Sequence, residues 1–229
     1  MNAESAVQGE TRSERRKRLN RQALIEAGYQ IMAEKGIDAA TMSEIANRAD
    51  VGAGTAYNYF ASKDELAMAV MEQVMDQLAK RIDAVTDTFS DPAQVYAFGH
   101  RTVMQVATTD QRWRWLLRRS EVIADAMYRM IGPYAIRDLR RAAAAGRFKF
   151  ADAELVYRLA THMIVGLSLA VCDGKVDQTK IDETVVLLLC MVGMSREEAW
   201  EISQRPCPAL PEESADEKLF VEALSQNSA

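Results

Sequence analysis

The sequence has few of the residues that break helices, cross-link secreted domains or bind metals. Its 229 residues include 11 glycines and 5 prolines, a low content that favours long helices. The three cysteines are widely spaced and form no Cys-x-x-Cys pair, so we predict neither a disulfide framework nor a zinc ribbon. Only two histidines are present, and the HExxH and GxSxG motifs are missing. We therefore predict a protein that is not an enzyme and has no metal or cofactor.

Long apolar runs are also missing. The two longest, near residues 163–172 and 185–194, are shorter than the roughly 20 residues that a membrane-spanning helix needs. The N-terminal residues lack the apolar core of a secretory signal, and the KDEL sequence at 63–66 is internal, so it is not a retention signal. We expect a cytoplasmic protein with no membrane partner.

The charge is distributed unevenly along the chain. The net charge of −5 argues against a protein that binds nucleic acid over its whole surface. Residues 11–30, however, include six arginines and lysines and only two acidic residues. A basic block of this kind indicates a local anionic partner or, alternatively, a solubilising tail.

Apolar periodicity and capping signals predict a first helix, two short helices and then a long one. The first begins near Arg15 and stops at Gly36, which follows a lysine. The sequence TMSE at 41–44 is a capping box that begins a second helix, and a turn at 50–52 leads into a third. A further capping signal, SKDE, begins a helix that extends from residue 63 to about residue 86.

The rest of the chain also reads as helix after helix, and no segment alternates as a strand would. We therefore predict an all-α protein. The expected later helices cover 92–107, 110–119, 121–145 with a break at Pro133, 152–173, 181–193, 195–204 and a last one from residue 214.

The stretch VGAGTAYNYFASKDEL, residues 51–66, allows three interpretations. A phosphate-binding loop would need a preceding strand and a third glycine or a Gly-Lys-Ser/Thr sequence, all of which are missing. An aromatic-rich core turn also fits the spacing. The order of short helix, glycine-containing turn and short helix is typical of a helix-turn-helix, whose second helix enters the major groove of DNA. In that case, small residues would allow close approach and polar residues would contact DNA.

The same region resembles the N-terminal domain of the TetR family of bacterial transcriptional regulators. Over about residues 15–71 it carries the patterns T-x-x-x-I-A-x-x-A-x-V, G-T-x-Y-x-Y-F and S-K-x-x-L. It departs from the family at Gly52, where a serine N-cap is frequent, and at Ala56, where a larger aliphatic residue is usual. The resemblance implies that DNA is contacted by Thr41, Ala53, Thr55, Tyr57, Asn58, Tyr59 and Lys63. The helix-turn-helix interpretation adds Gly54, whose small size would let the backbone approach DNA.

A DNA partner also gives the basic N-terminal segment a function. It precedes and begins the first helix, so it is placed to reach flanking phosphates or the minor groove. We expect Arg15, Arg16 and Arg18 to contribute to DNA binding.

Two later segments, 155–171 and 184–194, are apolar nearly all round, which predicts helices buried on more than one side. An internal core pair in a monomer would explain them, and so would a subunit interface. The resemblance implies the interface, a four-helix bundle formed by two protomers. The residues expected there are Leu155, Leu159, Gly166, Ala170, Val185, Leu188, Leu189 and Val192.

The middle region, 92–163, combines aromatic residues and methionines with a few polar groups, as both an adaptable ligand pocket and an ordinary helical core do. The resemblance implies a pocket for a small-molecule effector. The expected lining residues are Tyr96, His100, Met104, Trp113, Met127, Tyr128, Met130, His162 and Met163.

We therefore expect a disordered arm (1–13), a helix-turn-helix DNA-binding domain (14–65) and a larger helical ligand-binding and dimerisation domain (66–229). The expected function is that of a homodimeric repressor that binds a near-palindromic double-stranded DNA operator. A small apolar or amphipathic effector would release it. The alternative is a ligand-independent helical DNA-binding protein.

Overall fold

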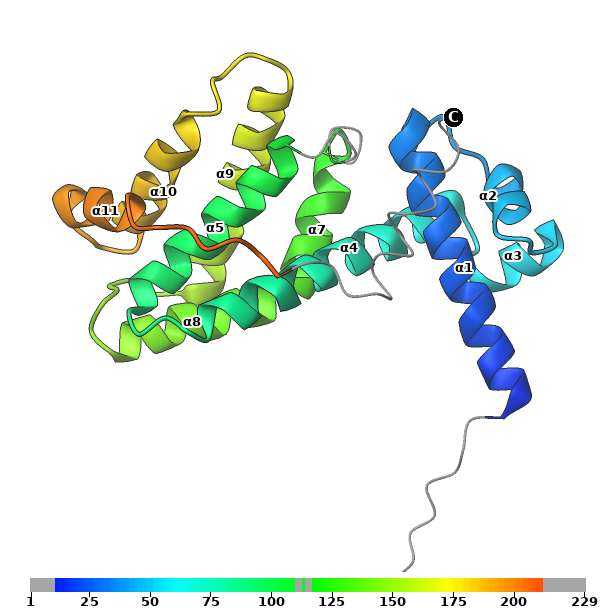
Figure 1. Cartoon of the computed structure of the whole chain (residues 1–229), viewed down its shortest axis with the longest axis horizontal. Helices are drawn as coiled ribbons and strands as arrows, with labels where there is room; N and C mark the ends of the chain where they lie inside the picture. Colours follow the sequence, from blue (N-terminus) through cyan, green and yellow to red (C-terminus); the bar gives the residue numbers. More distant parts are fainter. Residues whose placement is uncertain (1–10, 110–112, 114–116, 212–229) are drawn as a thin grey trace, which may run out of the picture.

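The computed structural model describes residues 11–109, 113 and 117–211, and in this part of the chain it contains ten α-helices and no strand (Figure 1). The predicted all-α fold is confirmed. The predicted helix from residue 214 and most of the one at 110–119 lie outside the described residues. The helices are α1 (Arg12–Lys35), α2 (Met42–Arg48), α3 (Ala53–Tyr59), α4 (Lys63–Thr86), α5 (Pro92–Thr109), α7 (Ser120–Met130), α8 (Gly132–Ala144), α9 (Ala153–Cys172), α10 (Lys180–Met191) and α11 (Arg196–Ser203).

The first three helices form a small unit with its own apolar centre. Helix α1 ends where Gly36 takes a positive φ of 89° and its N–H donates to the Met32 carbonyl over 2.9 Å. The side chains of Ile45 and Ala56 are completely buried, and Phe60 is 2% exposed. Helix α2 packs against α1, and α3 packs against α2.

Helix α4 connects this unit with the rest of the molecule (Figure 1). Ser62 caps its N-terminus by accepting a hydrogen bond from the Glu65 N–H over 3.1 Å, while the Glu65 carboxylate accepts from the Ala61 N–H. Its 24 residues, at 1.5 Å each, give a rod roughly 36 Å long. The rod packs against α1 near its beginning and against α5 and α7 further along.

The larger bundle is arranged around α5, which contacts α8, α9, α10 and α11. The predicted helix at 121–145 is two helices, because α7 ends at Met130 and Pro133 lies in the first turn of α8, where its missing N–H costs nothing. Asp91, just before α5, accepts hydrogen bonds from Arg147 and Arg205, so one carboxylate joins three distant segments.

Helix α9 is long and apolar enough to meet the length and composition criteria for a membrane-spanning helix. Core helices of soluble proteins meet the same criteria. Here Val156, Tyr157 and Ala160 face the bundle interior, whereas Leu155 and Leu159 are 54% and 51% exposed. The described residues therefore leave these two leucines uncovered on the outer face of α9, beside the exposed polar residues Arg158 and His162.

Candidate functional site

The turn between α2 and α3 is built by one residue with left-handed backbone. Asp50 has φ 53°, a conformation that aspartate tolerates better than most residues, and the Val51 N–H donates to the Ala46 carbonyl over 2.9 Å. The sequence pointed to both Asp50 and Gly52 as turn residues, but Gly52 has φ −57° and needs no glycine. It is the N-cap of α3 and provides no side-chain hydrogen bond there.

Helix α3 presents small and polar residues to solvent. Ala56 is completely buried, whereas the DNA-contacting positions predicted on the outer face of this helix are exposed. Tyr57 is 55% exposed, and no atom outside the helix lies within 4 Å of a Cβ built on Gly54. This surface has the shape and the hydrogen-bonding groups that a recognition helix needs. Its residues are Ala53, Gly54, Thr55, Tyr57 and Asn58, with Tyr59 half-buried at the edge.

The N-terminus of α2 is held by a complete capping box. The Thr41 hydroxyl accepts from the Glu44 N–H over 3.3 Å and donates to the Glu44 carboxylate over 2.7 Å. Lys35 lies 2.5 Å from the same carboxylate, and the hydrogen bonds from Lys35 and Thr41 lower the pKa of Glu44 to about 2. A phosphate bound at Thr41 would therefore replace Glu44 as the acceptor of its hydroxyl proton.

Lys63 begins α4 beside the recognition helix. Its ammonium group donates to the Asp38 carbonyl over 2.7 Å, and its side chain is half-buried. The cation is thus held near the N-terminus of α4, whose unpaired N–H groups also favour an anion. This position suits a phosphate contact.

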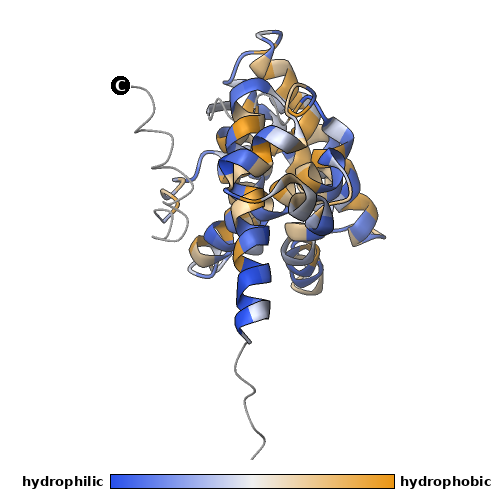
Figure 2. Ribbon diagram, turned by 90° about the vertical axis from the view of Figure 1, so that its right-hand side faces the viewer, coloured by the Kyte–Doolittle hydropathy of each residue, from blue (hydrophilic) through white to orange (hydrophobic). Residues whose placement is uncertain are grey.

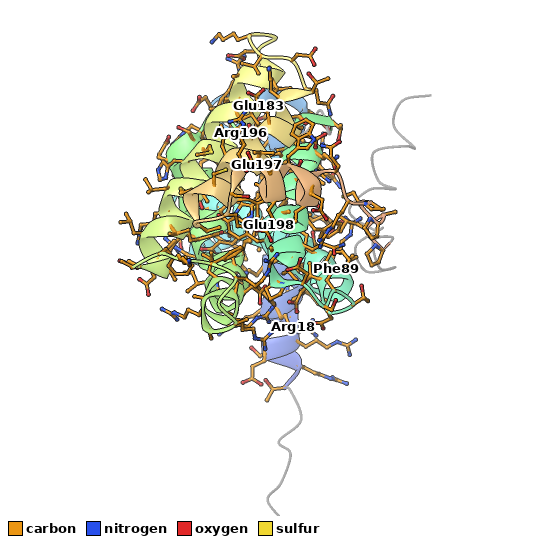
Figure 3. All side chains as sticks on the ribbon, turned by 90° about the vertical axis from the view of Figure 1, so that its left-hand side faces the viewer. Arg18, Phe89, Glu183, Arg196, Glu197 and Glu198 are labelled. Atoms are coloured by element: carbon orange, nitrogen blue, oxygen red, sulfur yellow. The ribbon has the colours of Figure 1, made fainter. Side chains whose placement is uncertain are left out.

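The three predicted basic residues lie on the exposed first turns of α1, not on an extended arm. The helix begins at Arg12, with Thr11 as its N-cap, so it starts earlier than the sequence indicated. Figure 2 shows that these turns are hydrophilic and project from the body of the molecule, and Figure 3 places Arg18 on the same projecting part. The helix therefore presents Arg15, Arg16 and Arg18 as a rigid basic extension beside the helix-turn-helix.

A cavity lies in the larger bundle, between α4, α5, α7, α8 and α9. Its empty space of about 580 Å³ includes a part that is open to solvent. Most of its lining is apolar. The lining residues are Ala79, Ile82, Asp83, Thr86, Val95, Tyr96, Gly99, His100, Val103, Met127, Ile131, Tyr134, Ala135, Asp138, Tyr157 and Ile164.

Three of the nine residues predicted for the pocket, Tyr96, His100 and Met127, line this cavity. The other six do not. Met104 and Trp113 are buried elsewhere in the core, and Tyr128, Met130 and Met163 are half-buried against its outside. His162 is exposed, because it lies three residues after Leu159 on the outer face of α9.

The acidic residues of the cavity were not among the predicted lining residues. Asp83 lies four residues after Ala79 on the inner face of α4, and Asp138 faces it from α8. Arg137 joins them, with its Nη2 2.7 Å from Asp83 and its Nε 2.8 Å from Asp138. A carboxylate within the apolar stripe of α4 is the signal that would have pointed to them.

The predicted dimer residues divide between the surface and the core. Leu155, Leu159 and Gly166 are exposed on α9, and Ala170 is half-buried. The other four predicted residues, three in α10 and one at its C-cap, are completely buried within one chain, because the helix turns this face toward α5 and α11. Their assignment to an interface was wrong, and the exposed apolar residue of α10 is Leu187, which is 47% exposed. The buried four are Val185, Leu188, Leu189 and Val192.

Arg119, at the beginning of α7, connects the bundle with the helix-turn-helix unit. Its guanidinium lies 3.2 Å from Asp38 in the loop after α1, 3.8 Å from Asp64 in the first turn of α4 and 3.0 Å from Glu121. The hydrogen bond to Glu121 is the main cause of its raised pKa. Because Met127 of α7 lines the cavity, this helix touches both the cavity and the DNA-binding unit.

A helix-turn-helix unit joined by a long helix to a larger helical bundle defines a helical DNA-binding regulator of transcription. The chain belongs to the TetR family. Residues 24–70 match the family model described as bacterial regulatory proteins, tetR family, and residues 91–205 match that of the tetracyclin repressor-like C-terminal domain.

Curated relatives are transcriptional regulators. The chain is 31% identical to the repressor KstR of Mycobacterium tuberculosis over 134 residues. This aligned region covers 56% of this chain and 51% of KstR. It is 39% identical over 67 residues to the regulator BetI of Rhizobium meliloti, which covers 29% of this chain and 32% of BetI. The chain thus spans about half the length of these relatives or less.

A solved structure matches along a greater length. The crystal structure of RolR in complex with the ligand resorcinol superimposes with a TM-score of 0.78 and 30% sequence identity, over 87% of this chain and 100% of RolR. Both parts of the fold are therefore shared with that protein.

Proposed function

We propose that this protein is an effector-responsive transcriptional repressor that binds a near-palindromic operator as a homodimer in the cytoplasm. The DNA-binding part would comprise residues up to about 65, and the remainder would bind the effector and the second protomer. Loss of operator binding when a small apolar or amphipathic effector occupies the cavity would switch transcription on.

The proposal rests on the position of α4, which extends from the DNA-binding unit to the cavity. It begins at Lys63, beside the recognition helix, and its other half supplies Ala79, Ile82, Asp83 and Thr86 to the cavity wall. A ligand that changes the packing of these residues would move a rigid rod whose far end holds the DNA-binding unit. The effector and the operator would then bind best to two different positions of α4.

The relatives support the individual parts of this proposal. KstR is a repressor, and RolR, which shares both parts of the fold, was crystallised with resorcinol. We infer that this chain also takes a small molecule in its larger domain.

The dimer would place two α3 helices on one face of DNA. The exposed leucines of α9 and α10 form an apolar surface suitable for a second copy, and a two-fold axis would repeat every contact. The half-sites would then lie one helical turn of DNA apart, roughly 34–36 Å, or a multiple of it.

Selection of bound DNA from a random pool tests DNA recognition directly. We expect enrichment of a near-palindrome, and a pool without an enriched sequence would refute the proposal. Release of the selected operator by a small-molecule library then separates the two candidate functions. A protein that no compound releases would be the ligand-independent DNA-binding protein.

A further inference from the structure

The cavity contains a buried hydroxyl group with no protein partner. Tyr96 of α5 is 4% exposed and lines the cavity, and its hydroxyl oxygen has no hydrogen-bond partner among the described residues. Buried tyrosine hydroxyls usually find a partner, because leaving one unsatisfied is unfavourable. A molecule that packs closely against Tyr96 in the cavity would supply the hydrogen bond that this hydroxyl lacks.

His100 provides a hydrogen-bond acceptor one turn further along the same helix. Its Nδ1 lies 2.7 Å from the Tyr96 carbonyl, and because a carbonyl can only accept, Nδ1 carries the proton. Burial lowers the pKa of His100 to about 4, so the ring is neutral at physiological pH and Nε2 is an acceptor. The two rings lie side by side, with centroids 4.0 Å apart.

The charges beside the cavity do not favour an anion. Arg137 is the cation nearest its lining carboxylates, and it is already bonded to both Asp83 and Asp138. These three side chains together carry a charge of about −1 at neutral pH. A carboxylate ligand would therefore lose its hydration in the cavity without meeting an unpaired positive charge.

We infer that the cavity takes an uncharged, hydroxyl-bearing ring compound, whose hydroxyl donates to His100 Nε2 and accepts from the Tyr96 hydroxyl. The apolar walls hold the ring, and the Tyr96–His100 pair distinguishes the hydroxyl from a methyl group. This assignment deepens the proposed function and rests on the cavity being its effector site.

Three probes of similar size test the assignment by isothermal titration calorimetry at pH 7.5: phenol, toluene and benzoate. We expect phenol to bind about tenfold more tightly than toluene, because toluene leaves the Tyr96 hydroxyl and His100 unpaired. Benzoate should not bind measurably. Equal affinities for phenol and toluene, tighter binding of benzoate than of phenol, or no binding of any probe would each overturn the inference.

A pair of matched variants locates the effect. Tyr96→Phe should reduce the preference for phenol over toluene to about threefold, because His100 Nε2 still accepts from phenol, while the affinity for toluene is retained. Tyr128→Phe removes the same hydroxyl from outside the cavity and should leave the tenfold preference intact. Thermal unfolding of both variants verifies that they are folded, and a Tyr96→Phe protein that keeps the full preference would overturn the assignment.

Operator binding without ligand is measured separately. If phenol is preferred through Tyr96 but no operator is selected, the ligand assignment stands and the proposed repressor function fails. If an operator is selected but phenol and toluene bind equally, DNA recognition stands and the ligand assignment fails.

Discussion

At the scale of the residue, burial decides the charge of His100. Desolvation lowers its pKa from the ordinary 6.5 to about 4, against the opposing effect of the hydrogen bond to the Tyr96 carbonyl. Between these two values the unfolded chain binds a proton that the folded chain does not. Stability is therefore fully present above pH 6.5 and falls as the pH falls toward 4.

His100→Gln should remove this pH dependence. In urea unfolding, we expect the wild-type free energy of unfolding to fall between pH 7.5 and pH 4.5 by about 2–3 kcal/mol more than that of the variant. The comparison of the two proteins cancels the titration of the carboxylates they share. Parallel pH profiles would mean that folding does not lower the pKa of His100.

Gly52 is the second residue whose environment makes a prediction. It is the N-cap of α3 without a side-chain bond, and a Cβ added there meets only the Thr55 hydroxyl at 3.6 Å. Gly52→Ser should supply the missing acceptor and raise the free energy of unfolding by a few tenths of a kcal/mol. Gly52→Ala, which adds the Cβ without the acceptor, is the control, and we expect it to be less stable than the serine variant.

At the scale of the element, the sequence predicted where helices begin and end better than which side of a helix is buried. Gly36, Thr41 and Ser62 act on neighbours within one turn, so the sequence alone places the ends of α1, α2 and α4 well. Helix α10 is apolar nearly all round, and periodicity cannot then tell its core side from its outer side. Only packing against α5 and α11 decides that Val185 is buried and Leu187 is exposed.

If the projecting turns of α1 contact DNA, operator binding should depend on their arginines and on salt. Replacing Arg15, Arg16 and Arg18 with alanine should weaken operator binding and flatten the slope of log affinity against log salt, by about 0.9 for each phosphate that is no longer neutralised. The same change at Arg140, Arg141 and Arg196, exposed arginines of the larger bundle, alters the net charge equally and should leave the slope unchanged. An unaltered slope in the first variant would remove α1 from the interface.

At the scale of the whole molecule, the cavity could be predicted only in part. Its lining comes from α4, α5, α7, α8 and α9, and no local pattern records which side chains of five helices converge. Tyr96, His100 and Met127 were anticipated as aromatic, polar and adaptable residues, but Met104 has the same character and fills the core instead. Asp83 interrupts the apolar stripe of α4, but only packing shows that it shares the Arg137 guanidinium with Asp138.

The ion pairs of Arg119 should contribute to the coupling between ligand binding in the cavity and operator binding. Arg119→Ala removes the ion pairs of α7 with Asp38 and Asp64, each a surface pair of at most about 1 kcal/mol. We expect the ratio of operator Kd values with and without a cavity ligand to fall by about two- to fivefold. Arg140→Ala, which breaks a pair with Glu154 inside the bundle, should leave the ratio unchanged. An undiminished ratio in Arg119→Ala would assign the coupling to α4 alone.

The exposed leucines of α9 allow a test of where the dimer interface lies. Leu159→Glu places a carboxylate on the apolar surface formed with Leu155, and in a two-fold dimer each interface would contain two such charges. We expect light scattering to show a dimer for the wild type and a monomer for the variant, with weaker operator binding because a monomer engages one half-site alone. Leu19→Glu adds the same charge to an equally exposed leucine of α1, 50% exposed, and should remain a dimer. A dimeric Leu159→Glu protein would place the interface elsewhere, and the apolar surface of α9 would then need another partner.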